Sequence, residues 1–174
     1  GPDRTLTARI TELEATSPPP RREHLPGSGK AALMRVSEMT PAFAAWLYER
    51  VGRTHHWFVR RNMPEAALRG LIDARTREFW VLYVGGSPGG FFELDLSGLP
   101  GTVDIALLGL MPEFQGRGLG RFLASEAMFA AFAHHPERVT IETNTLDHPR
   151  ALPLYQKLGF SPTGSRTELV EPWT

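Results

Sequence analysis

The residues best suited to hold a phosphate group form a glycine-rich hexapeptide, Gln115-Gly116-Arg117-Gly118-Leu119-Gly120. It follows an apolar segment typical of a strand and precedes a segment whose apolar residues have helical spacing. Glycine allows tight turns and close approach to a ligand, and the first N–H groups of a helix lack partners within it. These groups lie at the positive end of the helix dipole. The hexapeptide therefore predicts a binding site for a pyrophosphate.

Two other phosphate-binding patterns fit the sequence less well. The dinucleotide fingerprint needs its third glycine three positions after the second, whereas here it follows two positions after. The segment Gly27-Ser28-Gly29-Lys30 is similar to half of a nucleotide-triphosphate loop. That loop requires glycine where His24 stands and Ser or Thr where Ala31 stands. Neither nucleotide site is expected.

The composition argues against several other chemistries. The chain has 174 residues and no cysteine, which excludes disulfides, thiolate zinc sites and a cysteine nucleophile. The pairs His55-His56 and His134-His135 lack a spaced carboxylate partner, so no metal is expected. The formal net charge is zero and no apolar run approaches the roughly 18 residues of a membrane span. We expect a cytoplasmic protein that binds neither nucleic acid nor a membrane.

Two segments resemble the GNAT acetyltransferases. The hexapeptide is similar to the Q/R-x-x-G-x-G/A signature whose amides hold the pyrophosphate of coenzyme A in that family. Residues 139–160 (VTIETNTLDHPRALPLYQKLGF) resemble its strand and N-x-x-A-x-x-L-Y-x-x-x-G-F element. The matching residues are Ala151, Leu154, Tyr155, Gly159 and Phe160. His148 replaces the usual asparagine, and Asn144 is a candidate to supply the missing amide. The resemblance covers roughly residues 31–171.

The resemblance implies roles for single residues. Tyr155 matches the family's general acid, which protonates the leaving thiolate; the alternative is a core tyrosine. The N–H of Leu110 is the oxyanion candidate. Asp104, 11 positions before Gln115, matches a strand carboxylate used as base in histone-type members. We expect Glu93 almost opposite Asp104 as an alternative base, since two close carboxylates raise one another's pKa. Solvated surface charges are the other interpretation of both.

Acetyl-CoA is the co-substrate that the resemblance implies, with no metal. The cofactor-binding residues it implies are Leu110, Met111, Gln115, Gly116, Arg117, Gly118, Leu119, Gly120, Arg121, Asn144, His148 and Tyr155. The loop over 53–61 is expected to line the acceptor pocket through Trp57, Arg60 and Arg61. Its arginines suit an amine that carries a carboxylate or phosphate. Alternatively, Trp57 and Phe58 pack on the sheet while the arginines face water.

Apolar periodicity and turn residues predict the elements that position these residues. Strands are expected over 32–36, 79–84, 91–96, 103–110 and 139–143, with a last one near 168–170. Helices are expected from Thr40-Pro41, with an apolar stripe of Phe43, Trp46, Leu47 and Val51, from Pro64, over 118–133 and over 151–158. Residues 85–90 are expected to form a turn. The resemblance implies an α/β (α+β) GNAT fold, with a central mixed, mostly antiparallel twisted sheet flanked by helices.

The chain is expected to divide near residue 30. Residues 1–30 comprise a short strand over Thr5–Leu13 and a proline-rich strap, after Gly1-Pro2, which resembles the scar of a tag-cleaving protease. Residues 31–174 form the acetyltransferase domain. The N-terminal strand is expected to dock on this domain or on a second subunit, so a homodimer is considered. The expected reaction is direct acetyl transfer to a small-molecule or peptide amine; the alternative is a catalytically silent acyl-CoA-binding module.

Overall fold

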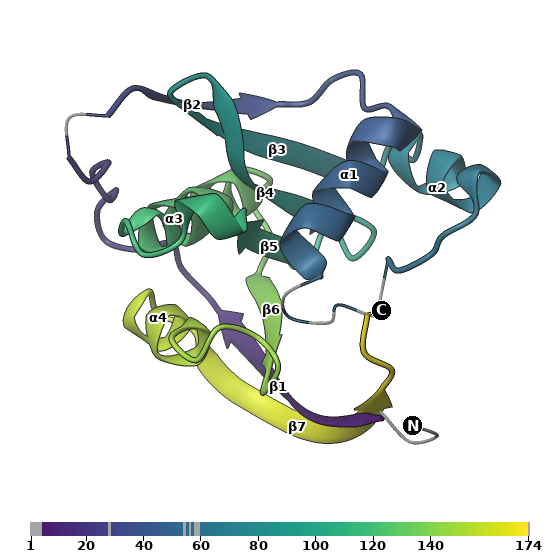
Figure 1. The fold of residues 1–174 in the computed structure, drawn as a ribbon. Coiled ribbons are helices and arrows are strands. Elements are labelled where there is room, and N and C mark those ends of the chain that lie inside the picture. Colours follow the sequence, from purple (N-terminus) through teal and green to yellow (C-terminus); the bar gives the residue numbers. More distant parts are fainter. Residues whose placement is uncertain (1–4, 28, 54, 56, 58–59, 174) are drawn as a thin grey trace.

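The computed structural model describes residues 5–27, 29–53, 55, 57 and 60–173. These residues form one sheet with the strand order β2-β3-β4-β5-β6-β1-β7, flanked by helices (Figure 1). The strands are β1 (Leu6–Ala15), β2 (Ala31–Arg35), β3 (Arg77–Val84), β4 (Ser87–Asp95), β5 (Thr102–Leu110), β6 (Arg138–Asn144) and β7 (Ser161–Val170). The helices are α1 (Pro41–Gly52), α2 (Glu65–Ile72), α3 (Leu119–Phe132) and α4 (Ala151–Lys157), with a 3-10 turn η1 (Pro112–Phe114). Only β5–β6 is parallel, so the expected mixed, mostly antiparallel sheet is confirmed.

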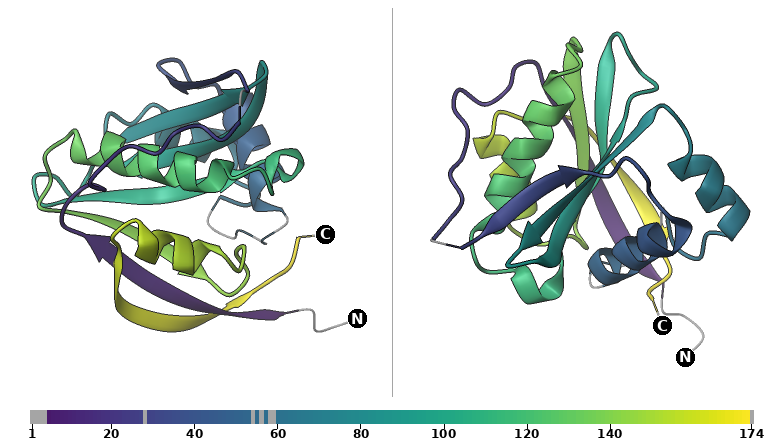
Figure 2. Two further views of the ribbon diagram at one scale, coloured as in Figure 1. Left: turned by 90° about the vertical axis from the view of Figure 1, so that its left-hand side faces the viewer. Right: turned by 90° about the horizontal axis from the view of Figure 1, so that it is seen from above.

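The helices lie on both faces of the sheet (Figure 2). Helices α3 and α4 cover one face, named here the α3 face, while α1 with α2 beside it covers the other, the α1 face. The core under α3 joins Leu123 and Met128 to Phe92 of β4. The core under α1 joins Leu47 to Phe91, the neighbour of Phe92. Successive strand residues point to opposite faces, so β4 serves both cores.

Helix α1 begins where the sequence predicts. The Thr40 side chain accepts a hydrogen bond from Phe43 N at 3.2 Å, and Pro41 occupies the first turn. The buried residues of this helix are Ala44, Leu47, Tyr48, Val51 and Gly52. The expected stripe is wrong at Trp46, which is 41% exposed and stacks on Phe43 with ring centroids 6.1 Å apart. Position 46 lies outside the face that the helical repeat turns toward the sheet.

Two strands are longer than expected. The turn between β3 and β4 needs only Gly85 and Gly86, whose φ angles are 58° and 89°. Strand β4 already begins at Ser87, which pairs with Val84, and Gly90 pairs with Leu110 of β5. A Cβ at Gly90 would stand 2.8 Å from the carbonyl oxygen of Gly109, so this close approach requires glycine. Strand β7 begins at Ser161 rather than near 168, although most of its side chains are exposed. The extent of β7 is set by its backbone pairing with β1, and the pattern of apolar residues in the sequence does not show this pairing.

The N-terminal strand lies inside the sheet. Strand β1 pairs with β6 on one side and with β7 on the other. Its buried residues Ala8, Ile10, Leu13 and Ala15 are at most 3% exposed. The N-terminal segment therefore docks on its own chain and separates two other strands of the same sheet.

The segment that connects β1 to β2 lies along α3 (Figure 2). Arg22 pairs with Glu126 at 2.9 Å, and its guanidinium lies 4.3 Å from the centre of the Phe129 ring. Glu23 pairs with Arg121 at 2.8 Å, in the first turn of α3. The expected strap thus contacts the helix that follows the glycine-rich loop. In the described part of the chain, no helix has both the length and the apolar character to cross a bilayer.

Candidate active site

The candidate site lies where β5 and β6 separate. These parallel strands pair only as far as Ile105 and Ile141, although β5 continues to Leu110 and β6 to Asn144. A cavity of about 490 Å³ lies between their ends. Its walls are the end of β5, the glycine-rich loop, the start of α3, the turn after β6 and α4. An unpaired strand edge offers backbone N–H and C=O groups to a ligand.

The glycine-rich loop needs its glycines at two positions. Gly116 and Gly118 both have a φ of 76°, in the left-handed region that disfavours side chains. Gly118 is also the N-cap of α3 and offers no side-chain acceptor to the first N–H groups of the helix. Gly120 lies inside the helix, and a Cβ there would meet only Leu110 and Leu154, at 3.8 and 4.0 Å. The start of α3 therefore has no side-chain cap, as an anion-binding helix N-terminus requires.

The structure brings most of the predicted cofactor residues to this cavity. Those that line it are Leu110, Gln115, Gly116, Gly118, Leu119, Gly120, Arg121, Asn144, His148 and Tyr155. Met111 and Arg117 do not. Met111 is 2% exposed in the core under α1, and the guanidinium of Arg117 stacks on Phe114, 4.9 Å from the ring centre.

The Leu110 N–H faces the cavity side of β5. Met111 N donates to Gly89 O at 2.8 Å, toward β4. Successive N–H groups of a strand point in opposite directions, so the Leu110 N–H points away from β4. The gap between β5 and β6 lies on that side. This N–H is available to an oxyanion beside it.

Tyr155 reaches the cavity from α4. The residue is 6% exposed, and its ring packs edge-on against Phe160 with centroids 6.0 Å apart. Among the described residues, none accepts a hydrogen bond from its hydroxyl. Burial raises the pKa of Tyr155, and the carboxylate of Asp147 raises it further. The hydroxyl therefore stays protonated at neutral pH and can donate to a ligand.

The family assignment rests on the sequence that builds this cavity. Residues 37–160, which contain both β5 with its loop and α4, match the acetyltransferase (GNAT) family. The chain belongs to this family. Comparison with curated proteins gives no match.

Solved structures share the GNAT fold at low identity. A GNAT-family protein from Novosphingobium aromaticivorans is 17% identical with a TM-score of 0.64, over 97% of this chain and 66% of that one. A GCN5-related N-acetyltransferase from Sphaerobacter thermophilus is 16% identical with a TM-score of 0.68, over 97% and 53%. An aminoglycoside acetyltransferase from an uncultured soil sample is 14% identical with a TM-score of 0.60, over 74% and 86%. The chain thus spans between about half and two thirds of the length of the first two.

Glu93 does not stand opposite Asp104, which corrects the expectation for this GNAT sheet. The β4–β5 hairpin pairs Asp95 with Asp104, and the extra residue Ala106 in β5 shifts Glu93 to Leu107. Glu93 is fully buried, and its carboxylate accepts hydrogen bonds from three side chains. These are Tyr48 at 2.5 Å, Arg60 at 2.6 Å and Arg77 at 2.8 Å. Its charge is engaged in holding the fold, which does not suit a base.

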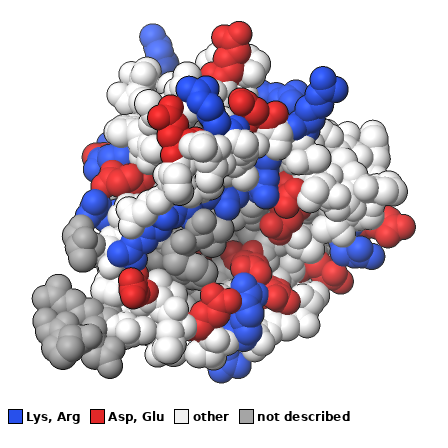
Figure 3. All heavy atoms as spheres, turned by 90° about the vertical axis from the view of Figure 1, so that its right-hand side faces the viewer, with Lys and Arg blue, Asp and Glu red and all other residues white. Residues whose placement is uncertain are grey.

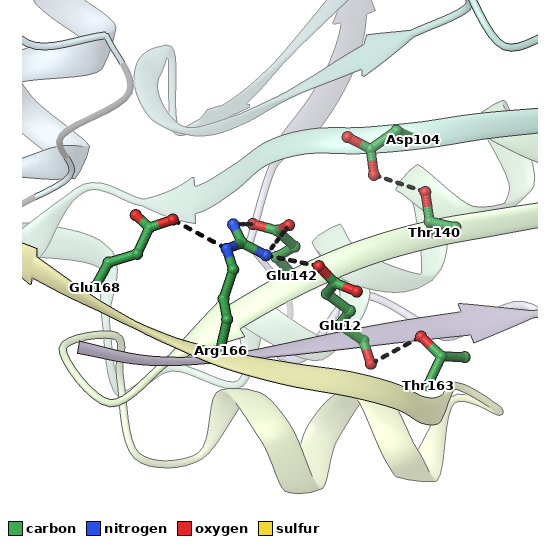
Figure 4. A network of polar contacts seen from close by, with 7 residues as sticks. All are labelled: Glu12, Asp104, Thr140, Glu142, Thr163, Arg166 and Glu168. Atoms are coloured by element: carbon green, nitrogen blue, oxygen red, sulfur yellow. Dashed lines mark hydrogen bonds and ion pairs between the residues drawn. The ribbon is translucent and has the colours of Figure 1, made fainter.

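Asp104 lies on the sheet beside the cavity, outside its lining. Its Oδ1 accepts from the Thr140 hydroxyl at 2.7 Å (Figure 4). Burial raises the pKa of Asp104, although the Thr140 hydrogen bond lowers it. Nearby on the sheet, Arg166 pairs with Glu12, Glu142 and Glu168 at 2.6, 2.9 and 3.0 Å. In the described residues, no group of His, Asp and Glu is arranged to hold a metal ion.

The predicted acceptor arginines are held by their own chain. Arg60 binds Glu93, and Arg61 donates to the carbonyl oxygens of Glu171 and, at 2.7 Å, of Pro172. Neither lines the cavity, so the structure does not bring them to the candidate site, and their role toward the acceptor stays a prediction. Trp57 does line the cavity, where its ring packs near Gly109 and Phe91. Phe58 and His56 lie outside the described residues.

Two cavity residues were missed by the sequence analysis. Asp147 Oδ2 accepts from Thr143 Oγ1 and from Asn144 N, both at 3.0 Å. Asn144 Oδ1 accepts from Leu146 N at 2.8 Å, so its side chain closes this turn. His55 lines the same cavity, and its Nδ1 lies 2.8 Å from the carbonyl oxygen of Leu146 in this turn. An Asn-x-x-Asp turn after a strand is a usable local signal for Asp147; no local pattern marks His55.

Proposed function

We propose that the protein transfers an acetyl group from acetyl-CoA to a primary amine by direct attack. The observation that carries this proposal is the single cavity that joins the uncapped start of α3 to the Tyr155 hydroxyl through the gap between β5 and β6. The chain has no cysteine, which removes the thiolate route through a covalent intermediate.

The binding residues follow from the groups that lack partners. The first N–H groups of α3 suit the pyrophosphate, next to the left-handed Gly116 and Gly118. The free edge of β5 suits the amide-rich arm of coenzyme A. The Leu110 N–H stabilises the oxyanion that develops when the amine attacks the thioester. Arg121 can reach a phosphate by exchanging its ion pair with Glu23.

Tyr155 supplies the proton for the departing sulfur. A thiol has a pKa of about 8.5, so a tyrosine with a raised pKa does not protonate the thiolate spontaneously. The transfer is therefore coupled to cleavage of the carbon–sulfur bond. Glu93 is not retained as a base, because it is buried and paired. Asp104 can act on the amine only through a water, since it does not line the cavity.

The acceptor is a small-molecule or peptide amine. The arginines that suggested an anionic acceptor are occupied by Glu93 and by the C-terminal backbone. Acidic and basic side chains are interspersed over the face that includes α1 and the C-terminus (Figure 3). A catalytically silent acyl-CoA-binding module is the second candidate, and the free Tyr155 hydroxyl favours the enzyme.

Calorimetry with acetyl-CoA and release of free thiol in the presence of primary amines test the proposal. Tyr155→Phe keeps the ring and removes the donor, so acetyl-CoA affinity should stay close to wild type while kcat falls roughly 10²–10⁴-fold. Tyr83→Phe, on β3 in the core under α1, is the matched control and should keep full activity. Binding without turnover by any amine would favour the silent module, and absence of binding would contradict both.

A further inference from the structure

His55 and Asp147 meet at the cavity from segments that are far apart in the chain. His55 follows α1, and Asp147 belongs to the turn after β6. Both line the cavity that contains Tyr155 and the end of β5. The amine must lose a proton in this cavity, and no function has yet been given to either residue.

The hydrogen bond of His55 determines which ring nitrogen is basic. Its Nδ1 lies 2.8 Å from the carbonyl oxygen of Leu146. A carbonyl oxygen only accepts, so Nδ1 carries the hydrogen and Nε2 of the neutral ring has a free lone pair. Among the described residues, none is hydrogen-bonded to Nε2. A half-buried imidazole with one nitrogen anchored on backbone and the other free is suited to accept a proton.

His148 lines the same cavity in the opposite tautomer. Its Nδ1 accepts a hydrogen bond from Arg150 N at 3.1 Å, so the hydrogen of the neutral ring is on Nε2. No lone pair is left to accept a proton from an amine. His55 and His148 are thus distinguished by their backbone partners.

Asp147 interacts electrostatically with both His55 and Tyr155. Hydrogen bonds from Thr143 and Asn144 fix its carboxylate. Burial raises the pKa of Asp147, while these hydrogen bonds and the charge of His55 lower it, so the two side chains interact. The same carboxylate raises the pKa of Tyr155. The negative charge of Asp147 therefore keeps the proton on Tyr155, and this carboxylate belongs to the residue after Leu146, whose carbonyl oxygen anchors His55.

Building on the proposed function, we propose that His55 Nε2 accepts the proton of the attacking amine and that Asp147 is a positioning residue that stabilises the imidazolium. His55 takes one proton from the ammonium form of the acceptor and releases it to solvent. The neutral amine nitrogen then forms a bond to the thioester carbon, and the carbon–sulfur bond breaks. The N–H proton moves to His55, and the Tyr155 proton moves to sulfur. The imidazolium then returns one proton to the tyrosinate through solvent, so the products are an amide and a free thiol.

The tautomer of His55 can be tested without any activity. Long-range proton–nitrogen NMR of the free protein, with His55→Asn to assign the signals, should show a neutral ring protonated on Nδ1. Protonation on Nε2 at neutral pH would overturn the proposal.

Kinetics with matched variants test the proton transfer. In His55→Asn the amide can still donate to Leu146 O, but nothing stands at the Nε2 position. We expect kcat/KM at pH 7 to fall roughly 10²–10⁴-fold and the deficit to shrink as pH rises, because the amine then deprotonates unaided. His135→Asn is the control, because His135 is exposed at the far end of α3 and has a φ of 55°, which asparagine tolerates.

Asp147→Asn tests the positioning role through the pH profile. Loss of the carboxylate disfavours the imidazolium, so the lower break of the kcat/KM profile should move to lower pH. The other titratable groups that line the cavity remain in this variant. In addition to Tyr155 and His55, they are Arg121, Glu142, His148, Arg150 and Lys157. A fall in rate with an unmoved break would assign Asp147 a structural role only and overturn that part of the proposal.

The outcomes separate the two levels of the proposal. A His55→Asn protein that folds, binds acetyl-CoA and turns over at the wild-type rate at every pH overturns His55 as base, and Asp104→Asn is then the variant to compare. A His55→Asn protein with a lowered melting temperature is replaced by His55→Gln, for which the same pH dependence is expected. A wild-type protein that binds acetyl-CoA without acetylating a diamine, an aminoglycoside or a lysine peptide overturns the proposed function and this inference together.

Discussion

At the residue scale, Asp95 and Asp104 face each other across β4 and β5 in different environments. For Asp95 burial raises the pKa, but the Ser97 N–H and Arg77 lower it below its usual value. For Asp104 burial dominates and the pKa is raised. The same residue type on one hairpin therefore contributes to stability with opposite signs.

Asp104→Asn and Asp95→Asn should shift the change in stability between pH 3 and pH 7 in opposite directions. A group whose pKa is raised on folding binds its proton more tightly in the native state, so it lowers stability as pH rises above the unfolded value of about 3.9. Asp104→Asn should therefore gain stability between pH 3 and pH 7 relative to wild type. Asp95 has a lowered pKa, so its carboxylate stabilises the folded state above the unfolded pKa. Asp95→Asn should therefore lose stability relative to wild type between pH 3 and pH 7. Urea unfolding at both pH values measures this, and changes of one sign would contradict it.

Glu93 carries a prediction about stability. Glu93→Gln leaves Arg60, which is 11% exposed, without its carboxylate partner, and leaves Arg77, which is 19% exposed, only its pair with Asp95 at 3.4 Å. Breaking a buried pair in this way typically costs 3–5 kcal/mol, so we expect a loss of about 3 kcal/mol or more in unfolding free energy. Glu168→Gln removes an exposed pair with Arg166 and should cost less than about 1 kcal/mol. A stable Glu93→Gln protein with a large loss of turnover would restore Glu93 as a base.

At the element scale, the start of α3 combines backbone conformation with ligand binding. Gly118 needs its left-handed φ, whereas Gly120 is helical and has room for a Cβ. One alanine substitution at each position can therefore distinguish the conformational role of Gly118 from the ligand-binding role of Gly120.

Gly118→Ala should lower both the melting temperature and acetyl-CoA affinity, because the strained residue costs about 1 kcal/mol or more. Gly120→Ala should raise the melting temperature slightly, because alanine favours a helix, and weaken acetyl-CoA binding, since residue 120 lines the cavity. Gly70→Ala in α2 has open space around it and should stabilise by about 0.5–1 kcal/mol without changing affinity. Differential scanning fluorimetry and calorimetry report the two effects. Unchanged affinity in folded Gly118→Ala and Gly120→Ala proteins would contradict the pyrophosphate site.

At the scale of the whole molecule, the sheet depends on its N-terminal strand. Within the sheet that the structure describes, β7 pairs with β1 alone, so removal of β1 would detach β7 and uncover β6. The wall of the cavity is affected as well, because Ile10 of β1 lines it.

Two leucine substitutions test this dependence. Leu13→Ala in β1 removes a side chain that is 1% exposed and should cost about 2–5 kcal/mol. Leu169→Ala in β7 removes one that is 74% exposed and should change stability by less than about 0.5 kcal/mol. Deletion of residues 1–25 should abolish the cooperative unfolding transition. A deletion variant that unfolds cooperatively near the wild-type midpoint would show that β1 is dispensable.

The sequence by itself determined the features that depend on residues a few positions apart. The cap of α1 at Thr40, the left-handed glycines before α3 and the spacing that carries Tyr155 into α4 are all of this kind. A φ angle, a capping hydrogen bond and a helical repeat are set within one or two turns of chain, so local patterns reveal them.

Only the tertiary structure decided which distant segments meet. It inserted β1 between β6 and β7, set Asp95 opposite Asp104, engaged Arg60 with Glu93, and brought His55 to the turn that contains Asp147. Strand order and register follow from the burial and backbone pairing of whole segments, and one extra residue at a bulge moves every later partner. Such pairings leave no local pattern, which is why the conformation of the glycine-rich loop was predictable and the contact of His55 with the turn that contains Asp147 was not.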